Sequence, residues 1–254
     1  MKSWYSIKNI AGKTKIYIFE EIGFWGITAK NFLEDIKGVG DIDLHINSVG
    51  GSVFDALAIY HTLRQHTGAV DVYIDGLAAS SASIIAMAGK TIHMPENAFM
   101  MIHDPTMMAW GDSNEMQKAL DLLTKTKDVI LNIYEERSGA DRATLEDAMS
   151  NETWYTGGEA KAIGLVDVVT DPIELAARAS FAEYKNIPKD ILARFAKAKP
   201  THKEFESHLR DAFGFSRSEA TAVAGHGLGA LKHGDRASET AEMLRNAAKQ
   251  IKSF

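Results

Sequence analysis

Two patterns of apolar residues take turns along the first two thirds of the chain. Runs rich in β-branched and aromatic residues predict strands at 15–19, 41–47 and 70–74. Between these runs, apolar residues recur every three or four positions at 28–36 and 53–63, which predicts helices. Strands that alternate with helices over short links indicate an α/β fold with a mostly parallel sheet covered by helices.

The same alternation continues to residue 169. The predicted elements that follow are a helix at 78–87, strands at 91–94 and 98–102, a long helix from about 112 to 138, helices at 142–149 and 157–163, and a closing strand at 165–169. The long helix carries one apolar stripe, made of Met116, Leu120, Leu123, Ile130 and Tyr134. Such a stripe packs inside the same chain or against another subunit.

Beyond residue 171 the pattern changes. Residues 172–254 contain no strand-like run and are rich in Ala, Lys and His. Helical patterns are broken at Pro200 and at 225–227, which leaves helices at 188–198, 203–213, 217–224 and 237–251. We therefore expect two parts, a domain at 1–171 and a helical, partly mobile extension at 172–254.

Composition and charge limit the classes of function. The 254 residues are 45% hydrophobic and 24% charged, as in ordinary soluble globular proteins. The absence of cysteine excludes disulfides, thiolate metal sites and cysteine nucleophiles. Residues 185–254 hold 13 Lys and Arg against 8 Asp and Glu, although the net charge of the chain is −6. A basic tail on an acidic body suggests two functional parts, or merely solvated helix faces.

Several kinds of site and location are not expected. The first 19 residues have scattered polar positions and no uninterrupted apolar core, so we expect neither a signal peptide nor a membrane anchor, and we expect a cytoplasmic location. No HExxH, GxxxxGK[ST] or GxGxxG motif occurs. We therefore expect no metal and no nucleotide cofactor. The basic tail has no recognisable nucleic-acid-binding motif and only a small excess charge, so we expect no nucleic-acid partner.

Candidate chemistry begins with a glycine pair. The stretch NSVGGSV ends a predicted strand and opens into a helix through Gly50 and Gly51. Glycine lets the backbone approach a ligand closely, so its N–H groups can point into a crevice. The pair is either an oxyanion hole or a tight turn.

A serine-rich joint and a histidine follow. The stretch GLAASSAS contains Ser80, Ser81 and Ser83 and lies between a predicted strand and a predicted helix. It is either a close-packed Ala/Ser joint or a turn that displays a nucleophilic serine. His103 ends an apolar strand in MIHDP and is expected at the same sheet edge. A serine hydroxyl needs an adjacent base to be nucleophilic near neutral pH, so the two together favour a serine–histidine pair. Ser83 is expected only to pack.

Four motifs follow one another along the chain, namely INSVGGSVFDALAIY, DGLAASSASIIAMAG, PENAFMMIHDP and WYTGGEAKAIGLVDVV. In this order they resemble the proteolytic subunit of the Clp protease family, and the resemblance runs from residue 16 to 169. It implies a ClpP/crotonase-like spiral of βαβ units and a serine endopeptidase that assembles into homo-oligomeric rings. It also implies Ser80 as nucleophile, His103 as base, and backbone N–H groups of Gly50 or Gly51 and of Ser81 as oxyanion donors.

The third triad member departs from the family pattern. Glu152 stands where the family usually has aspartate, with Asn151 beside it. A glutamate can orient an imidazole, but its extra methylene requires the backbone to lie further away. The alternative is that Glu152 is a solvated residue near a helix start.

The extension refines the functional hypothesis. FESHLRDAFGFSRSEATAVAGHGLGALK, together with EIGFWGITAKNFLEDI, resembles Clp-like proteases of phages and prophages that cleave capsid or scaffold protein during head maturation. The prediction is therefore a prohead protease acting on such a protein substrate, in the host cytoplasm or in the prohead interior. The alternatives are a general degradative Clp peptidase, a catalytically weak assembly scaffold, and a crotonase-type acyl-CoA enzyme. The sequence leaves open whether an ATP-driven unfoldase docks on the protein.

Overall fold

The structure, a computed structural model, describes residues 5–10, 13–23, 29–173, 184–189, 206, 210 and 216–226. The chain divides into two compact units, Met1–Ala196 and Lys197–Phe254. The second unit contains helix α9 (Arg217–His226), which confirms the helix predicted at 217–224. The other helices predicted for the extension fall mostly outside the described residues.

The first unit is built on a mixed sheet, whose described residues form eight strands. These are β1 (Tyr5–Ile10), β2 (Lys13–Ile18), β3 (Ile42–Ser48), β4 (Val70–Ala79), β5 (Thr91–Pro95), β6 (Phe99–Ile102), β7 (Thr153–Thr156) and β8 (Val168–Thr170). The main path runs β1-β2-β3-β4-β5-β8 and is parallel from β2 to β8, with β1 antiparallel at one edge. The parallel core and its helical crossovers confirm the predicted α/β class.

Strand β4 belongs both to the main part of the sheet and to a small outer part. Its first half pairs with β3 and β5, and its last three residues, 77–79, pair with β6 in parallel. Strand β7 then closes this outer part by pairing antiparallel with β6. The carboxyl ends of β4 and β6 therefore lie side by side, and this brings together the residues that follow the two strands.

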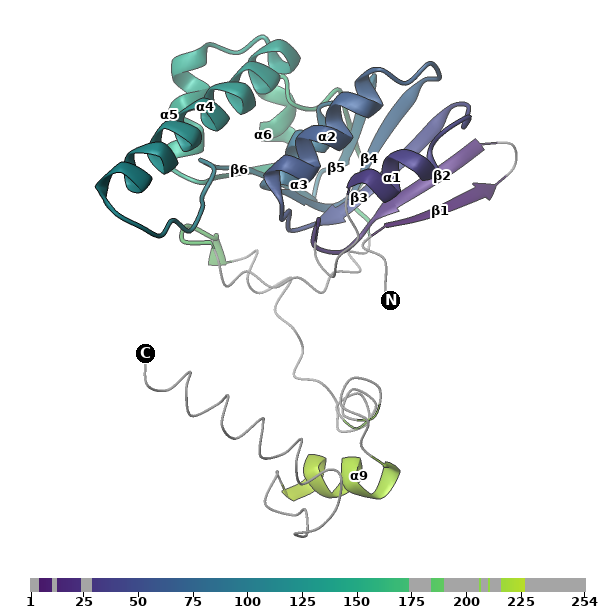
Figure 1. Ribbon diagram of the computed structural model, residues 1–254. Helices are drawn as coiled ribbons and strands as arrows, with labels where there is room; N and C mark the ends of the chain where they lie inside the picture. Colours follow the sequence, from purple (N-terminus) through teal and green to yellow (C-terminus); the bar gives the residue numbers. More distant parts are fainter. Residues whose placement is uncertain are drawn as a thin grey trace. The chain divides into compact units, whose positions relative to one another are not determined.

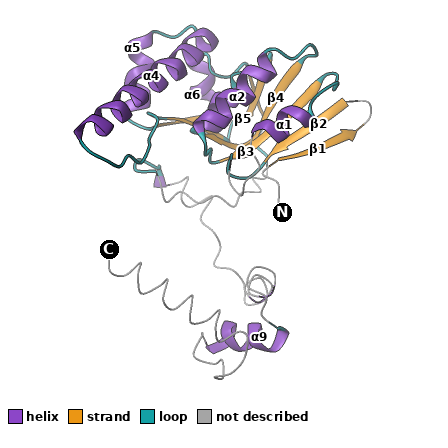
Figure 2. Ribbon diagram, viewed as in Figure 1, coloured by secondary structure: helices purple, strands orange, loops and turns teal. Residues whose placement is uncertain are grey.

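Helices cover the sheet in two groups (Figures 1 and 2). Helices α1 (Ala29–Asp35), α2 (Val53–Arg64) and α3 (Ser81–Ala86) lie along one face of the main sheet. The second group gathers beside β6 and consists of α4 (Ser113–Ser138), α5 (Arg142–Ser150) and α6 (Gly157–Ala162).

Apolar residues at alternate positions of the central strands form the face of the sheet on which the helices pack. Ile42, Leu44 and Ile46 of β3 are at most 1% exposed and point into the main core under α1 to α3. Apolar residues at alternate positions supply this core face, and burying each contributes about 1.5 to 3 kcal/mol. A second, smaller apolar cluster lies on the outer part of the sheet and consists of Leu77, Ala79, Phe99 and Met101.

The other face of the main sheet carries a row of stacked rings. Tyr17, His45, Tyr73 and His93 come from four adjacent strands, with ring centroids 4.8, 5.0 and 4.7 Å apart. His45 Nδ1 lies 2.9 Å from a carboxylate oxygen of Asp75. Because cross-strand ring pairs stabilise a particular register, this row helps to fix the parallel pairing of β2 to β5.

Some predicted boundaries and strands are wrong. Strand β4 continues to Ala79 and α3 begins at Ser81, whereas the sequence predicted a helix from 78. The closing strand is Val168–Thr170 rather than 165–169. Leu165 and Val166 are buried apolar residues that precede the strand. The sequence pattern also did not predict β1 and β7. Both are antiparallel partners at the sheet's margins, and the four residues of β7 are too few to show a period.

No helix among the residues that the structure describes is long and apolar enough to cross a bilayer.

Candidate active site

Ser80 stands at a sharp joint between β4 and α3. Its φ of 54° and ψ of −127° place a non-glycine residue in a strained region of backbone conformation. The Ser80 N–H donates to the Met101 carbonyl at 2.9 Å, which ties the joint to β6. This strand–turn–helix geometry is the one in which a nucleophilic serine is displayed at the end of a sheet.

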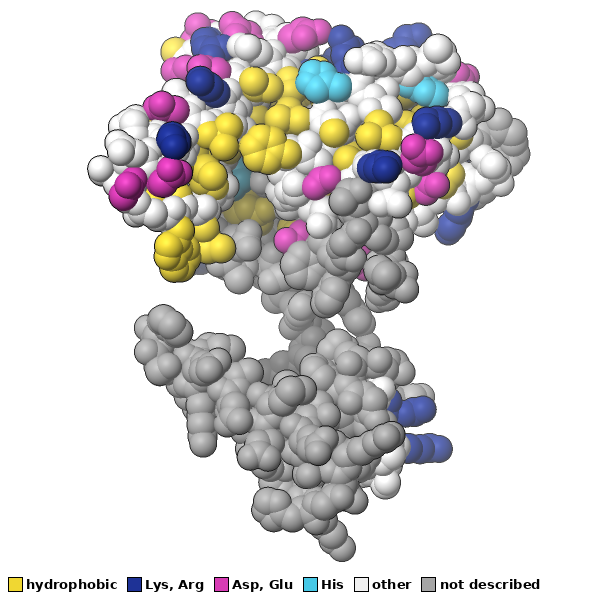
Figure 3. All heavy atoms as spheres, viewed as in Figure 1, with side chains coloured by type: hydrophobic (Ala, Val, Ile, Leu, Met, Phe, Trp, Pro, Cys, Tyr) yellow, Lys and Arg dark blue, Asp and Glu magenta, His cyan; other side chains and the backbone are white. Residues whose placement is uncertain are grey.

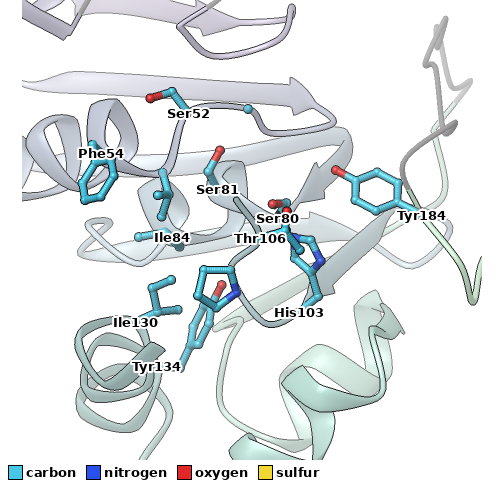
Figure 4. A pocket seen from close by; sticks show the side chains of 13 residues that line it. Ser52, Phe54, Ser80, Ser81, Ile84, His103, Thr106, Ile130, Tyr134 and Tyr184 are labelled. Carbon is cyan, nitrogen blue, oxygen red and sulfur yellow. Dashed lines mark hydrogen bonds between the residues drawn. The ribbon is translucent and has the colours of Figure 1, made fainter. Parts of the chain in front are cut away.

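His103 follows β6 directly and reaches the same joint. Its Nε2 atom lies 2.7 Å from Ser80 Oγ, which is hydrogen-bond distance. Figure 4 shows the two side chains facing each other at the mouth of a pocket. The structure thus brings together the serine and the histidine that the sequence singled out, and an unprotonated Nε2 can accept the Ser80 proton.

Ser83 does more than pack, contrary to the expectation from sequence. Its hydroxyl donates to the Ser80 carbonyl at 2.6 Å and lies 2.7 Å from the Tyr134 hydroxyl. Both side chains are at most 1% exposed, and burial raises the pKa of the Tyr134 phenol, which therefore remains protonated and able to donate. Ser83 and Tyr134 together fasten the Ser80 joint to α4, and the sequence pattern gave no sign of this link.

The glycine pair lies against the Ser80 joint. Gly50 has a φ of 100°, and a Cβ there would meet the Ala79 carbonyl oxygen at 2.7 Å and Ser80 Cβ at 2.9 Å. Gly51 has a φ of 141°, and a Cβ there would clash with the Ile22 carbonyl oxygen and lie 2.8 Å from the Ile22 backbone nitrogen. Only glycine fits both the space and the backbone conformation at these positions.

The two glycines differ in what their N–H groups can do. The Gly50 N–H donates to Ser48 Oγ at 3.1 Å, and Gly50 is buried. Gly51 is exposed and lines the pocket beside Ser80. Between the two alternatives that the sequence left open, the geometry favours Gly51 as the oxyanion donor.

A pocket of about 260 Å³ opens beside Ser80 and His103. Figure 4 shows Phe54, Ile84, Ile130 and Tyr134 at one end of it, and Tyr184 on the other side of the Ser80–His103 pair. The residues that line it are Gly51, Ser52, Val53, Phe54, Ser80, Ser81, Ile84, His103, Pro105, Thr106, Ile130, Tyr134 and Tyr184. An apolar end next to a polar reactive pair suits a peptide with an apolar side chain at the bond to be cut.

Ser81 lines the same pocket. It is 2% exposed, and its hydroxyl makes no hydrogen bond with any residue that the structure describes. Its backbone N–H belongs to the residue after the serine at the joint, which is the usual position of an oxyanion donor in a nucleophile elbow.

Glu152, the third candidate, is buried but turned to other partners. It is 9% exposed and has a φ of 51°. Among the described residues, its carboxylate accepts hydrogen bonds from the backbone N–H groups of Lys185 and Asn186, at 3.0 and 2.8 Å, and from Trp154 Nε1 at 3.4 Å. The His103 imidazole is not among these donors. Glu152 is therefore not the solvated helix-start residue of the alternative interpretation.

Tyr184 is a pocket residue that no sequence motif indicated. Its ring meets those of His103 and Trp154 edge-on, with centroids 5.7 and 5.6 Å apart, and its hydroxyl donates to the Val49 carbonyl. It lies far along the chain from every motif of the pocket, so no local pattern could have indicated it.

Among the residues of known placement, no group of three or more His, Asp or Glu side chains could hold a metal ion.

Comparisons with known proteins decide the family. The sequence model of the Clp protease family matches residues 27–172, more than half of the chain. The chain belongs to the Clp protease family. It is 37% identical over 139 residues to the ATP-dependent Clp protease proteolytic subunit of Ligilactobacillus salivarius strain UCC118, a match that covers 54% of this chain and 70% of that protein.

Membership of the Clp protease family implies a serine peptidase, and the mixed sheet with its flanking helices agrees with the fold of the family. The matched residues, 27–172, include the glycine pair, the Ser80 joint, His103 and Glu152. The match ends before the segment that contains Tyr184, so that contact is a feature of this chain outside the family match.

Proposed function

We propose that the protein is a serine endopeptidase in which Ser80 is the nucleophile and His103 is the general base. The observation that supports this most directly is the distance of 2.7 Å between Ser80 Oγ and His103 Nε2, at a strained joint beside a pocket. A close-packed joint or a structural histidine does not require backbone strain at Ser80. Such strain is expected where a turn displays a nucleophile.

The first half of the reaction forms an acyl-enzyme. His103 Nε2 takes the Ser80 proton while Oγ attacks the peptide carbonyl, and the negative charge develops on the carbonyl oxygen. The N–H groups of Gly51 and Ser81 are proposed to stabilise this charge, because both residues line the pocket together with Ser80. The protonated imidazole then gives its proton to the leaving amine, and the C–N bond breaks.

The second half regenerates the enzyme. A water molecule gives a proton to His103 Nε2 and attacks the acyl carbon. The imidazolium returns this proton to Ser80 Oγ, and the carboxylic acid product leaves. Each step uses the same two side chains and the same two N–H groups.

The third triad member in this proposal is Glu152. Its carboxylate is buried, and a carboxylate that accepts from Nδ1 would hold the ring in the tautomer that leaves Nε2 free. This requires the carboxylate to exchange its present backbone donors for the imidazole.

The substrate is proposed to be a polypeptide with an apolar residue before the bond that is cut. Phe54, Ile84 and Ile130 line the pocket end that would hold this side chain (Figure 4). Phe54 is 59% exposed, so a substrate side chain can cover it.

We propose further that residues 1–171 form the peptidase domain, that 172–254 is an extension added to it, and that the protein assembles into rings. Large apolar side chains are exposed on the first half of α4 and on the loop before it. They are Met107, Met108, Trp110, Met116, Leu120 and Leu122. Figure 3 shows hydrophobic side chains gathered over this end of α4. A patch of this kind usually marks an interface with another subunit.

Two roles in the cell are proposed. Both place the protein in the cytoplasm, and head maturation offers the prohead interior as a second location. The resemblance of the extension to phage proteins supports cleavage of capsid or scaffold protein during head maturation. The likeness to a bacterial Clp proteolytic subunit supports general degradation with an unfoldase.

The test uses the intact protein and its Ser80→Ala variant. Each is co-expressed with a phage capsid protein and its scaffold protein, and each is also supplied with an unfolded protein such as casein. We expect the intact protein to cleave at defined sites and the variant to lose at least about 1,000-fold in rate. Processing at the same sites and rate in Ser80→Ala would show that Ser80 is not the nucleophile.

The pattern of cleavage separates the alternatives. Cleavage confined to a few sites in capsid or scaffold protein supports head maturation, and extensive digestion of casein supports general degradation. Capsid assembly that proceeds equally with Ser80→Ala supports the assembly-scaffold alternative, and binding of coenzyme A supports the acyl-CoA enzyme.

A further inference from the structure

Residues 184–189, here called the strap, lie across one side of the candidate active site. Tyr184 lines the pocket, meets the His103 ring edge-on and donates its hydroxyl hydrogen to the Val49 carbonyl. Val49 immediately precedes the glycine pair. Tyr184 and Ile187 also pack on the apolar cluster of Leu77, Ala79, Phe99 and Met101.

The strap also holds the carboxylate of Glu152. Backbone N–H groups of Lys185 and Asn186 donate to the two carboxylate oxygens at 2.8 to 3.0 Å. The Asn186 side chain donates to the Asn151 carbonyl at 2.8 Å, which anchors the strap next to Glu152. Hydrogen bonds to a buried carboxylate are among the stronger ones in proteins, so this contact competes with any other donor to Glu152.

The position of the strap corresponds to one half of a bound substrate. The apolar end of the pocket lies on one side of Ser80 and His103, and Tyr184 lies on the other side (Figure 4). If the apolar end holds the acyl half of a peptide, the leaving half must run past Tyr184. A backbone carbonyl at the groove and an apolar surface beside it are the groups that an extended peptide would use there, and the strap occupies both.

We propose that the strap closes the leaving-group side of the active site, and that a polypeptide must displace it before cleavage. Displacement removes the two backbone donors from Glu152, so that its carboxylate becomes available to His103. The strap therefore selects substrates by their leaving group, because a small leaving group fits beside Tyr184 and a long peptide does not. This inference rests on the proposed serine peptidase function.

A reversible lock tests the proposal in the full-length chain. Because the chain has no cysteine, the double variant Asn151→Cys/Asn186→Cys can form only one disulfide within a chain, between the strap and its anchor. Mass spectrometry under oxidising and reducing conditions verifies the bond. Two substrates are compared in both states, an internally quenched peptide extending five residues to each side of the scissile bond and a 4-nitrophenyl ester of a short apolar acyl group.

We expect the oxidised lock to lower peptide turnover by about tenfold or more relative to the same protein after reduction, with ester hydrolysis equal in the two states. The single variants Asn151→Cys and Asn186→Cys are the matched controls, and neither should respond to oxidation. Equal peptide turnover in the locked and reduced states would overturn the proposal.

A second variant tests the strap without a disulfide. Tyr184→Ala removes the ring from the leaving-group side and the bond to Val49, so we expect peptide turnover to rise relative to ester hydrolysis in the same variant, with both rates expressed per Ser80 labelled by a fluorophosphonate. Slower peptide turnover would mean that Tyr184 supports the site rather than closing it. Failure of the proposed function gives a different result, namely no ester hydrolysis and no labelling of Ser80 in any variant.

Discussion

At the scale of single residues, three serines within four positions have three different environments. Ser80 Oγ faces His103, Ser81 Oγ is buried without a partner in the described residues, and Ser83 Oγ is bonded to the Ser80 carbonyl and close to Tyr134. The three serines are thus expected to have different roles. Ser80 is the nucleophile, Ser81 lines the pocket, and Ser83 holds the Ser80 joint in place.

Replacing Ser81 and Ser83 one at a time should have different effects on the free energy of unfolding. Ser83→Ala leaves the buried Tyr134 hydroxyl without its partner, so we expect the free energy of unfolding to fall by about 2 kcal/mol. Ser81→Ala removes an unpartnered buried hydroxyl and should leave that free energy within about 0.5 kcal/mol or raise it. Urea denaturation followed by tryptophan fluorescence measures both.

The double variant Ser83→Ala/Tyr134→Phe is the control for this comparison. It removes both hydroxyls of the pair and should recover part of the stability that Ser83→Ala loses. Equal losses for Ser81→Ala and Ser83→Ala would contradict the assigned environments.

The sequence could predict Ser80, His103 and the glycine pair because each lies at a strand end that its own neighbours define. The partners of Ser83 and Glu152 could not be predicted in this way. Tyr134 and the N–H groups of residues 185 and 186 come from distant parts of the chain, and only the folded structure brings them to the site.

At the scale of elements, α4 supports the active site from behind. Its last turns bury Ile130, Ile133 and Tyr134, whereas Met116 and Leu120 near its start are 39% and 56% exposed. The single stripe predicted from the sequence is therefore split, with one half in the core and the other half on the surface. Periodicity alone cannot show where along a helix the neighbouring elements end.

The N-terminal cap of α4 should contribute measurably to stability. Asp112 accepts hydrogen bonds from the N–H groups of Asn114 and Glu115, at 2.9 and 3.1 Å. We expect Asp112→Ala to lower the free energy of unfolding by about 1 kcal/mol. Asp121→Ala, which removes the same charge from an exposed mid-helix position, should cost less than about half of that. Equal effects of the two variants in urea denaturation would argue against the cap.

At the scale of the whole molecule, the exposed half of α4 predicts assembly. Leu120→Glu places a charge in the apolar patch, so we expect a shift to smaller species in sedimentation velocity, with a loss of peptide turnover. Gln117→Glu adds the same charge at a polar exposed position of the same helix and should leave assembly unchanged. An intact protein that sediments as a monomer would show that the patch does not join subunits.

The proposed mechanism requires His103 to activate Ser80, and covalent labelling measures this activation directly. The full-length protein is treated with diisopropyl fluorophosphate, and the labelled site is located by peptide mapping. We predict one phosphoryl group per chain, on Ser80, and a labelling rate at least about 100-fold lower in His103→Ala. Labelling of another residue, or equal labelling rates in the intact protein and in His103→Ala, would contradict the proposed mechanism.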